Sequence, residues 1–139
     1  MRLGESQILE SSEAQQTFGK ILAPSLERGA IVFLEGDLGA GKTTLIQGFL
    51  QGLDFVGEVN SPTYALMQHY PTPHGLVLHV DAYRVRDPLE LWSMGLEEYL
   101  EEARASFLEW GESFYSSFPE AWILRLEQVA QGRKITRVR

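Results

Sequence analysis

A glycine-rich stretch carrying one lysine and two threonines is the strongest chemical signal in this sequence of 139 residues. The stretch matches the phosphate-loop pattern G-x-x-x-x-G-K-[ST] at every fixed position. Its glycines allow backbone N–H groups to turn inward and to approach an anion closely. The pattern therefore predicts a site for the phosphates of a nucleotide, formed by Gly36, Asp37, Leu38, Gly39, Ala40, Gly41, Lys42, Thr43 and Thr44.

Each polar side chain of this loop has an expected partner on the nucleotide. Lys42 would place a cation on the β- and γ-phosphates, and the Thr43 hydroxyl would ligate Mg²⁺. Thr44 adds a second hydroxyl, which we expect near the α-phosphate. A helix that begins near Lys42 would contribute free N–H groups and the positive end of its dipole. The alternative is a glycine-rich turn with an exposed lysine, which the flanking sequence disfavours.

Two acidic residues at the ends of predicted strands, Asp81 and Glu109, are candidates to complete the site. In an open α/β sheet, ligands bind at the carboxyl ends of the strands. A Mg²⁺–nucleotide complex needs a carboxylate to help hold the metal, and hydrolysis needs a group that orients the attacking water. The alternative for each residue is a polar side chain that ends a strand without a further role.

Three further features are open to a functional and a structural interpretation. Thr63 in the Ser61-Pro62-Thr63 segment lies where NTPases often keep a γ-phosphate sensor, although this composition is also common in turns. Arg84 could neutralise developing phosphate charge or form a surface ion pair. Tyr83 and Trp110 are more often core or rim aromatics than base-stacking groups. The three histidines lack the spacing of a metal site, and we expect His79 to pack in or beside the sheet.

The elements that flank the loop have the order that the motif requires. Residues 30–34 form a continuous apolar run, which is typical of a buried strand. Apolar residues recur at helical spacing after the loop, at Leu45, Ile46, Phe49, Leu50 and Leu53. Strand, glycine loop and helix follow one another as in known phosphate loops.

The rest of the chain reads as further helices and strands. A helix is expected from about Glu13 to Arg28, with Ile21 on its apolar side and a kink or split at Pro24. Further strands are expected at residues 64–70, 76–80 and 105–108, and further helices at residues 89–94, 96–103 and 112–118. A terminal hairpin is expected from residues 121–126 and 134–138. The pattern predicts a single α/β domain over residues 1–139, a P-loop NTPase-like three-layer sandwich with a mixed, mainly parallel sheet flanked by helices and a C-terminal β-hairpin.

Composition narrows the possible functions. The net charge of −7 argues against a surface that binds nucleic acid by itself, since phosphate contacts need clustered lysine and arginine. The absence of cysteine excludes disulfides and cysteine-based zinc sites, and fits a cytoplasmic location. No signal peptide or membrane span is expected. None of the three lysines precedes an aspartate by two residues, as the Asn-Lys-x-Asp signature of GTPases requires, so ATP is favoured over GTP.

Four motifs in a fixed order resemble the TsaE family, also called YjeE. They are residues 36–44, Ser61-Pro62-Thr63-Tyr64, residues 79–84 (His-Val-Asp-Ala-Tyr-Arg) and residues 109–112 (Glu-Trp-Gly-Glu). The family comprises small bacterial P-loop ATPases needed to form threonylcarbamoyladenosine in tRNA. The resemblance covers about residues 10–130.

The resemblance implies roles for the motif residues. Lys42 binds the β- and γ-phosphates and Thr43 holds Mg²⁺. Glu109 matches the metal-binding carboxylate in the Walker B place, and Asp81 matches an acidic residue tied to ATP hydrolysis. Thr63 falls in a switch-like loop.

The resemblance also places Trp110 near the nucleotide, while Gly111 stands where relatives often have proline or alanine.

The resemblance implies partners as well. It predicts a complex with the TsaD and TsaB proteins, in which ATP binding or hydrolysis by this subunit resets the enzyme between turnovers. The threonylcarbamoyl transfer belongs to TsaD, so tRNA is met only through the complex.

Other functions remain open at this point. A small-molecule kinase would share the phosphate loop but needs an acceptor pocket and an arginine-bearing lid. A nucleotide-gated binding module would hardly hydrolyse its ligand. The basic C-terminal residues have two explanations, an edge strand protected by charge or a docking patch; they are Arg133, Lys134, Arg137 and Arg139.

Overall fold

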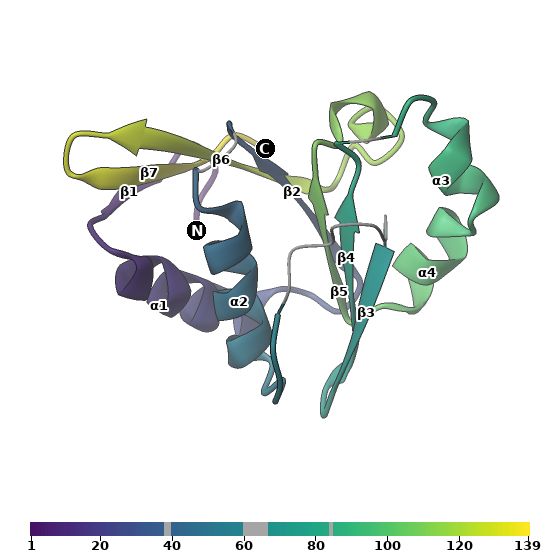
Figure 1. Cartoon of the computed structure of the whole chain (residues 1–139), viewed down its shortest axis with the longest axis horizontal. Coiled ribbons are helices and arrows are strands. Elements are labelled where there is room, and N and C mark those ends of the chain that lie inside the picture. Colours follow the sequence, from purple (N-terminus) through teal and green to yellow (C-terminus); the bar gives the residue numbers. More distant parts are fainter. Residues whose placement is uncertain (38–39, 60–66, 84) are drawn as a thin grey trace.

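A mixed sheet of seven strands, with helices on both faces, organises the part of the chain that the structure describes (Figure 1). This structure is a computed structural model, and it describes residues 1–37, 40–59, 67–83 and 85–139. The strands are β1 (Ser6–Leu9), β2 (Ala30–Glu35), β3 (Met67–Thr72), β4 (Gly75–Asp81), β5 (Ala105–Glu109), β6 (Trp122–Val129) and β7 (Gly132–Arg137). The helices are α1 (Ser12–Leu22), η1 (Ala23–Ser25), α2 (Lys42–Gly52), α3 (Leu89–Ser93), α4 (Leu96–Glu102) and η2 (Glu112–Phe114).

The interior of the sheet is parallel and its outer pairings are antiparallel. The strand order is β1-β7-β6-β2-β5-β4-β3. Strands β6, β2, β5 and β4 run parallel to one another, while β3, β7 and β1 are added in antiparallel hairpins or pairings. The carboxyl ends of β2, β4 and β5 therefore lie together at one edge of the sheet, where ligands of open α/β sheets bind.

Each face of the sheet has its own hydrophobic core, because the central strands are apolar on both sides. Helices α1 and α2 cover one face, where the Phe49 and Phe107 rings stack with centroids 4.3 Å apart. Helices α3 and α4 cover the other face, where Phe33 of β2 packs among the buried leucines of these helices. The two layers of helices around one sheet confirm the α/β sandwich expected from the sequence.

Helices α1 and α2 pack with almost no space between their backbones. A Cβ atom at Gly48 would lie 2.3 Å from the Gln16 carbonyl oxygen, and one at Gly52 would lie 2.5 Å from the Lys20 carbonyl oxygen. Across the contact, a Cβ at Gly19 would lie 2.8 Å from the Leu45 carbonyl oxygen. Glycine at these positions lets the two helices approach, and so sets α1 firmly against the helix that follows the phosphate loop.

The predicted first helix is split near Pro24, as expected, into α1 and the 3-10 turn η1. The prediction that Ile21 lies on its buried side is wrong, since this residue is 71% exposed. The buried side instead carries Gln15, Gly19 and Leu22, because the close glycine contact with α2 decides which face turns inward. The helix expected at residues 112–118 is reduced to the 3-10 turn η2.

The basic C-terminal strand does not lie at the edge of the sheet. Strand β7 pairs with β6 on one side and with β1 on the other, so the explanation by edge protection is wrong. Its arginines bond to nearby backbone: Arg137 donates to the Met1 carbonyl oxygen and covers the Trp122 ring. Arg139 donates to three carbonyl oxygens of residues 115–121. None of the helices in the described ranges has the length and apolar character needed to cross a membrane.

Candidate nucleotide-binding site

The phosphate loop joins the buried strand β2 to helix α2, as its sequence predicts. Gly36 and Gly41 take positive φ angles of 154° and 101°. A Cβ atom at Gly36 would lie 2.6 Å from the Leu126 carbonyl oxygen, so only glycine lets the loop leave β2 this close to β6. Helix α2 begins at Lys42, directly after Gly41. Its first N–H groups have no partner within the helix and are available to an anion.

A cavity of about 370 Å³ opens over the start of α2. Residues Gly41 to Thr44 belong to its lining, with Asp81 and Glu109 from the neighbouring strands β4 and β5. Ser12, Gln15 and Arg133 line it as well, from α1 and β7. Because β5 and β7 lie on opposite sides of β2 in the sheet, the cavity has a carboxylate end and an end that lacks carboxylates.

A larger cavity of about 760 Å³ lies elsewhere, between Leu26, Phe118 and Trp122. It contains no residue of the phosphate loop. We place the candidate site in the smaller cavity, because among the described residues only its lining combines the loop and its lysine with two carboxylates, the buried Glu109 and the half-buried Asp81.

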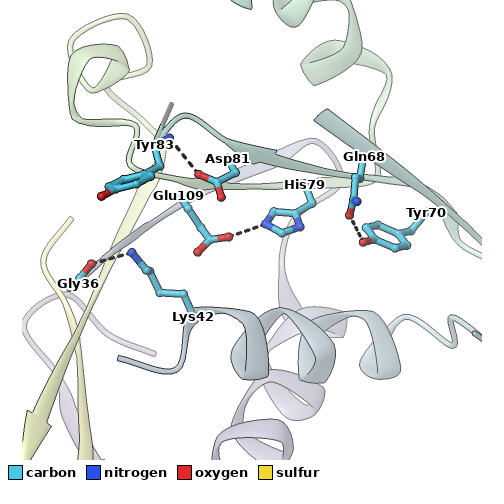
Figure 2. A network of polar contacts seen from close by, with 8 residues as sticks. All are labelled: Gly36, Lys42, Gln68, Tyr70, His79, Asp81, Tyr83 and Glu109. Carbon is cyan, nitrogen blue, oxygen red and sulfur yellow. Dashed lines mark hydrogen bonds and ion pairs between the residues drawn. The ribbon is translucent and has the colours of Figure 1, made fainter. Parts of the chain in front are cut away.

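Lys42 is held inside its own loop. The side-chain Nζ donates to the Gly36 carbonyl oxygen at 2.7 Å (Figure 2). It also lies 3.8 Å from the centroid of the Trp110 ring. The residue is only 5% exposed. Burial lowers the pKa of Lys42 below its usual value, while the negative charges of Glu109 and Asp81 oppose this shift. An ammonium with so little water around it interacts strongly with any added anion.

Asp81 and Glu109 are the last residues of adjacent parallel strands and are register partners. The Asp81 Oδ1 accepts a bond from the Tyr83 N–H at 2.9 Å, which fixes the turn after β4 (Figure 2). Burial raises the pKa of Asp81 above its usual range; the bond from Tyr83 partly offsets the rise, and the charge of Glu109 adds to it. Glu109 is 5% exposed and contacts the buried His79, with 2.7 Å between Oε2 and Nε2.

Trp110 closes the site beside the carboxylates. Its φ angle of 58° is in the left-handed region, which turns the chain sharply after Glu109. The indole ring faces the Lys42 ammonium and lies 5.0 Å, centroid to centroid, from the Tyr83 ring. The two aromatic residues both line the cavity, and the place of Trp110 near a nucleotide stays a prediction.

A comparison with known protein families explains why these groups occur together. The family model described as "Threonylcarbamoyl adenosine biosynthesis protein TsaE" matches residues 9–137. The chain belongs to the TsaE family. This confirms the family predicted from the four sequence motifs.

Individual TsaE proteins are similar over most of the chain. One from Haemophilus influenzae, named tRNA threonylcarbamoyladenosine biosynthesis protein TsaE, is 44% identical over 112 residues, which are 77% of this chain and 71% of that protein. One of the same name from Treponema pallidum is 35% identical over 132 residues, 91% of this chain and 96% of the other. The crystal structure of Bacillus subtilis YdiB is 26% identical, covers 97% of this chain and 83% of its own, and superposes with a TM-score of 0.77.

Several of the residues predicted for this TsaE site lie outside the described part of the chain. They are Leu38 and Gly39 of the loop, Thr63 of the switch-like segment, and Arg84. The described ones converge: Gly41, Lys42, Thr43, Thr44, Asp81, Glu109 and Trp110 line one cavity. Gly36, Asp37 and Ala40 line the adjoining cavity of about 670 Å³, which Trp110 also borders. At Gly111, a Cβ would lie 2.8 Å from the Phe33 ring, so this ring occupies the space that a larger residue would need.

Sequence reasoning missed four residues of the site. His79 precedes Asp81 by two positions on a strand, and that spacing puts both on one face, so the pattern offered a signal that we did not use. The sequence carried no such signal for Ser12, Gln15 and Arg133, because these residues come from elements that meet the loop only in the folded chain. Gln15 is buried against Gly41, and Arg133 donates from Nε to the Ala40 carbonyl oxygen at 3.1 Å.

The described residues suit a magnesium ion that arrives with a nucleotide. Among them, there is no group of three or more histidine, aspartate or glutamate side chains that could hold a metal alone. Mg²⁺ is typically bound by one or two carboxylates together with substrate phosphates and water. One hydroxyl, Thr43, and one or two carboxylates beside a phosphate loop form a donor set of that kind.

Proposed function

We propose that this TsaE-family protein binds ATP with Mg²⁺ and hydrolyses it. We further propose that it does so as an accessory subunit in tRNA threonylcarbamoyladenosine biosynthesis, driving the reset of a TsaD/TsaB partner in the cytoplasm. The observation that carries the proposal is the convergence of the phosphate loop with Asp81 and Glu109 in one cavity. The names of the related proteins supply the pathway.

Each residue of the site has a proposed role. The loop amides and Lys42 bind the β- and γ-phosphates, and Thr43 with Glu109 would hold Mg²⁺, which neutralises phosphate charge during transfer. Asp81 orients the attacking water. Thr63 stays the candidate for sensing the γ-phosphate. Trp110 covers the phosphates from the side of β5.

The orientation of the nucleotide follows from the two ends of the cavity. The metal and the γ-phosphate belong at the end with Asp81 and Glu109, because the carboxylates are there. The nucleoside then extends in the other direction, toward Ser12, Gln15 and Arg133. Arg133 is anchored to the Ala40 carbonyl oxygen, which holds its guanidinium beside the loop.

A kinase is the second candidate, and Arg104 does not supply the arginine that its lid would need. A lid arginine must reach the phosphates. Arg104 donates to the carbonyl oxygens of Leu26 and Glu27, near the amino ends of the strands and away from the loop. Incubation of the protein with ATP and candidate acceptors would reveal a kinase by a phosphorylated product, and an ATPase would release phosphate instead.

The proposal is tested by replacing Lys42 and measuring nucleotide binding. Lys42→Ala should lower the affinity for Mg²⁺–ATP about 10- to 100-fold, since it removes a charged hydrogen-bond donor from the phosphates. Fluorescence anisotropy of a labelled ATP analogue provides the measurement. Lys20→Ala, an exposed position on α1, is the matched control and should bind like the wild type.

Hydrolysis is tested separately, with TsaD and TsaB absent and present. Phosphate release by the wild type should rise when the partners are added, and Lys42→Ala should abolish that rise. Wild-type protein that takes up no ATP under either condition would contradict the proposed function. Tight binding without phosphate release in either condition would instead favour a nucleotide-gated binding module.

A further inference from the structure

We propose that His79 is a positioning residue for Glu109: its imidazole holds one carboxylate oxygen and so directs the other toward the bound metal. The proposal rests on the proposed function, in which Glu109 helps to hold Mg²⁺. It adds a residue whose role is not to touch the nucleotide or the metal but to set the geometry of the group that does.

The contact is short and almost completely removed from water. The His79 Nε2 lies 2.7 Å from the Glu109 Oε2 (Figure 2). The side chains of His79 and Glu109 are 0% and 7% exposed. They project from the adjacent strands β4 and β5, on the face that α1 and α2 cover, where Phe107 and Val77 belong to the core. Two polar groups buried in this position must satisfy each other.

The partner decides which nitrogen of the ring carries the proton. An ionised carboxylate only accepts hydrogen bonds, so the Nε2 of His79 must donate. The other ring nitrogen, Nδ1, is buried and has no hydrogen-bond partner among the described residues. The single polar contact that the structure shows for this ring is therefore the one to Glu109. An apolar residue could fill this part of the core without leaving a polar atom unsatisfied. The contact with Glu109 is therefore the reason for a histidine at this position.

Glu109 needs such a contact because of its neighbours. Its register partner on β4 is Asp81, a second carboxylate, and like charges at adjacent strand ends repel. The Lys42 ammonium attracts both carboxylates and competes with the metal for them. A hydrogen bond from one side restricts the carboxylate to a single orientation and leaves Oε1 for a ligand. Residues that orient metal ligands in this way typically change metal affinity about 10- to 100-fold when they are replaced.

The test compares two amides that differ by one methylene group. In His79→Gln, the terminal amide nitrogen reaches about as far as Nε2 and can still donate to Glu109. In His79→Asn, the amide stops short of it. The readout is the Mg²⁺ concentration at which the affinity for a fluorescent ATP analogue is half-maximally increased, together with the affinity in the absence of Mg²⁺.

We expect His79→Asn to raise that Mg²⁺ concentration about 10- to 100-fold and His79→Gln to recover most of the loss. Affinity for the nucleotide without Mg²⁺ should stay close to the wild-type value in both. The matched control is Ser106→Ala, which removes a buried β5 hydroxyl that has no partner among the described residues and is not in the cavity. It should leave the Mg²⁺ dependence unchanged.

Two results would overturn the inference. One is an unchanged Mg²⁺ dependence in folded His79→Asn, and the other is an equal loss in the Gln and Asn variants. Glu109→Ala separates this failure from a failure of the proposed function. Wild-type binding that is Mg²⁺-dependent and loses that dependence in Glu109→Ala supports the site, whatever the His79 variants do. Binding that ignores both Mg²⁺ and Glu109 removes the proposed metal site itself.

Discussion

Asp81 and Glu109 are two carboxylates placed side by side in a partly buried site, and this arrangement costs stability. Desolvation raises the pKa of Asp81, which means that the fold favours its protonated form. Lys42 shows the reverse, since desolvation lowers its pKa and disfavours the charged ammonium. Desolvation thus disfavours the charged form of both side chains. The opposite charges of a bound nucleotide and its metal would compensate for this cost, and pKa values shifted in this way are typical of functional sites.

Asp81→Asn should therefore stabilise the ligand-free protein at about pH 7. The wild-type residue has a folded-state pKa above its unfolded value, so its ionisation on raising the pH destabilises the fold. The amide keeps an Oδ1 acceptor for the Tyr83 N–H but carries no charge. Urea unfolding at neutral pH should show the gain, and the gain should shrink as the pH falls through the raised folded-state pKa and be lost below the ordinary aspartate value of about 3.9. A wild type that is the more stable protein at neutral pH would contradict this sign.

The same substitution should lower partner-stimulated ATP hydrolysis while sparing ATP affinity. Asp81 is proposed to orient water, a role that matters for turnover and not for binding. Wild-type hydrolysis should fall as the pH is lowered, because Asp81 becomes protonated. Since the pKa of Asp81 is raised, this fall should begin at a higher pH than an aspartate with an ordinary pKa would give. The matched control is Thr17→Ala, an exposed change on α1, which should keep the wild-type pH–rate profile. An Asp81→Asn protein with the same pH–rate profile as this control would contradict the role proposed for Asp81.

At the scale of elements, the contact of α1 with α2 connects stability to the nucleotide site. Helix α2 starts at the phosphate loop, and Gln15 of α1 packs on Gly41, where a Cβ would lie 2.3 Å from its Oε1. The glycines between the two helices thus determine where Gln15 stands. A change in that contact should be felt at the loop.

Gly48→Ala should destabilise the protein by about 1–3 kcal/mol, as overpacking in a core does. Its new methyl group would meet the Gln16 backbone at 2.3 Å, which cannot move without displacing α1. This outweighs the helix propensity that alanine adds, at most about 1 kcal/mol. Thermal unfolding is the measurement, with Thr17→Ala as the control, expected to change stability by less than about 0.5 kcal/mol. A more stable Gly48→Ala protein would mean that the helices have room to separate.

The hairpin of β6 and β7 brings Arg133 to the end of the cavity where we propose that the nucleoside lies. Arg133→Ala should lower the affinity for ATP about 10-fold and leave the affinity for inorganic tripolyphosphate nearly unchanged. Competition against a fluorescent nucleotide measures both ligands. Lys134→Ala, on the opposite face of β7, is the control. Equal losses for ATP and tripolyphosphate would show that Arg133 acts only through the loop it is anchored to.

At the scale of the whole molecule, charge decides how the protein can meet tRNA. The chain has 12 basic and 19 acidic residues. Of its C-terminal arginines, Arg133, Arg137 and Arg139 donate to backbone carbonyl oxygens of the protein itself. These arginines thus make structural contacts with the protein itself, and the docking patch considered from sequence stays a prediction.

The protein alone should bind tRNA no more tightly than about 100 µM at physiological salt, the weak limit of non-specific binding. Anisotropy of a labelled tRNA, with and without TsaD and TsaB, measures this. Binding to the mixture with none to the isolated chain would agree with an indirect role. Micromolar binding by the isolated chain with a steep salt dependence would contradict it.

Features encoded in contiguous residues could be predicted from the sequence. The apolar run predicts strand β2, and the closely spaced glycines and lysine after it predict the phosphate loop and the start of α2. Such local patterns specify the local backbone conformation. The last hairpin and the strand-end positions of Asp81 and Glu109 were predicted for the same reason. Family membership was predictable because four such local motifs occur in a fixed order.

Contacts between these parts became visible only in the folded chain. The pairing of β4 with β5 puts His79 on Glu109, the glycine contact turns Ile21 outward and Gln15 inward, and β1 encloses the basic strand β7. These outcomes depend on packing between segments distant in sequence, whose partners no local pattern names. A single chain reveals the type of each element, but strand order and helix rotation are set by how the elements bury one another's surface.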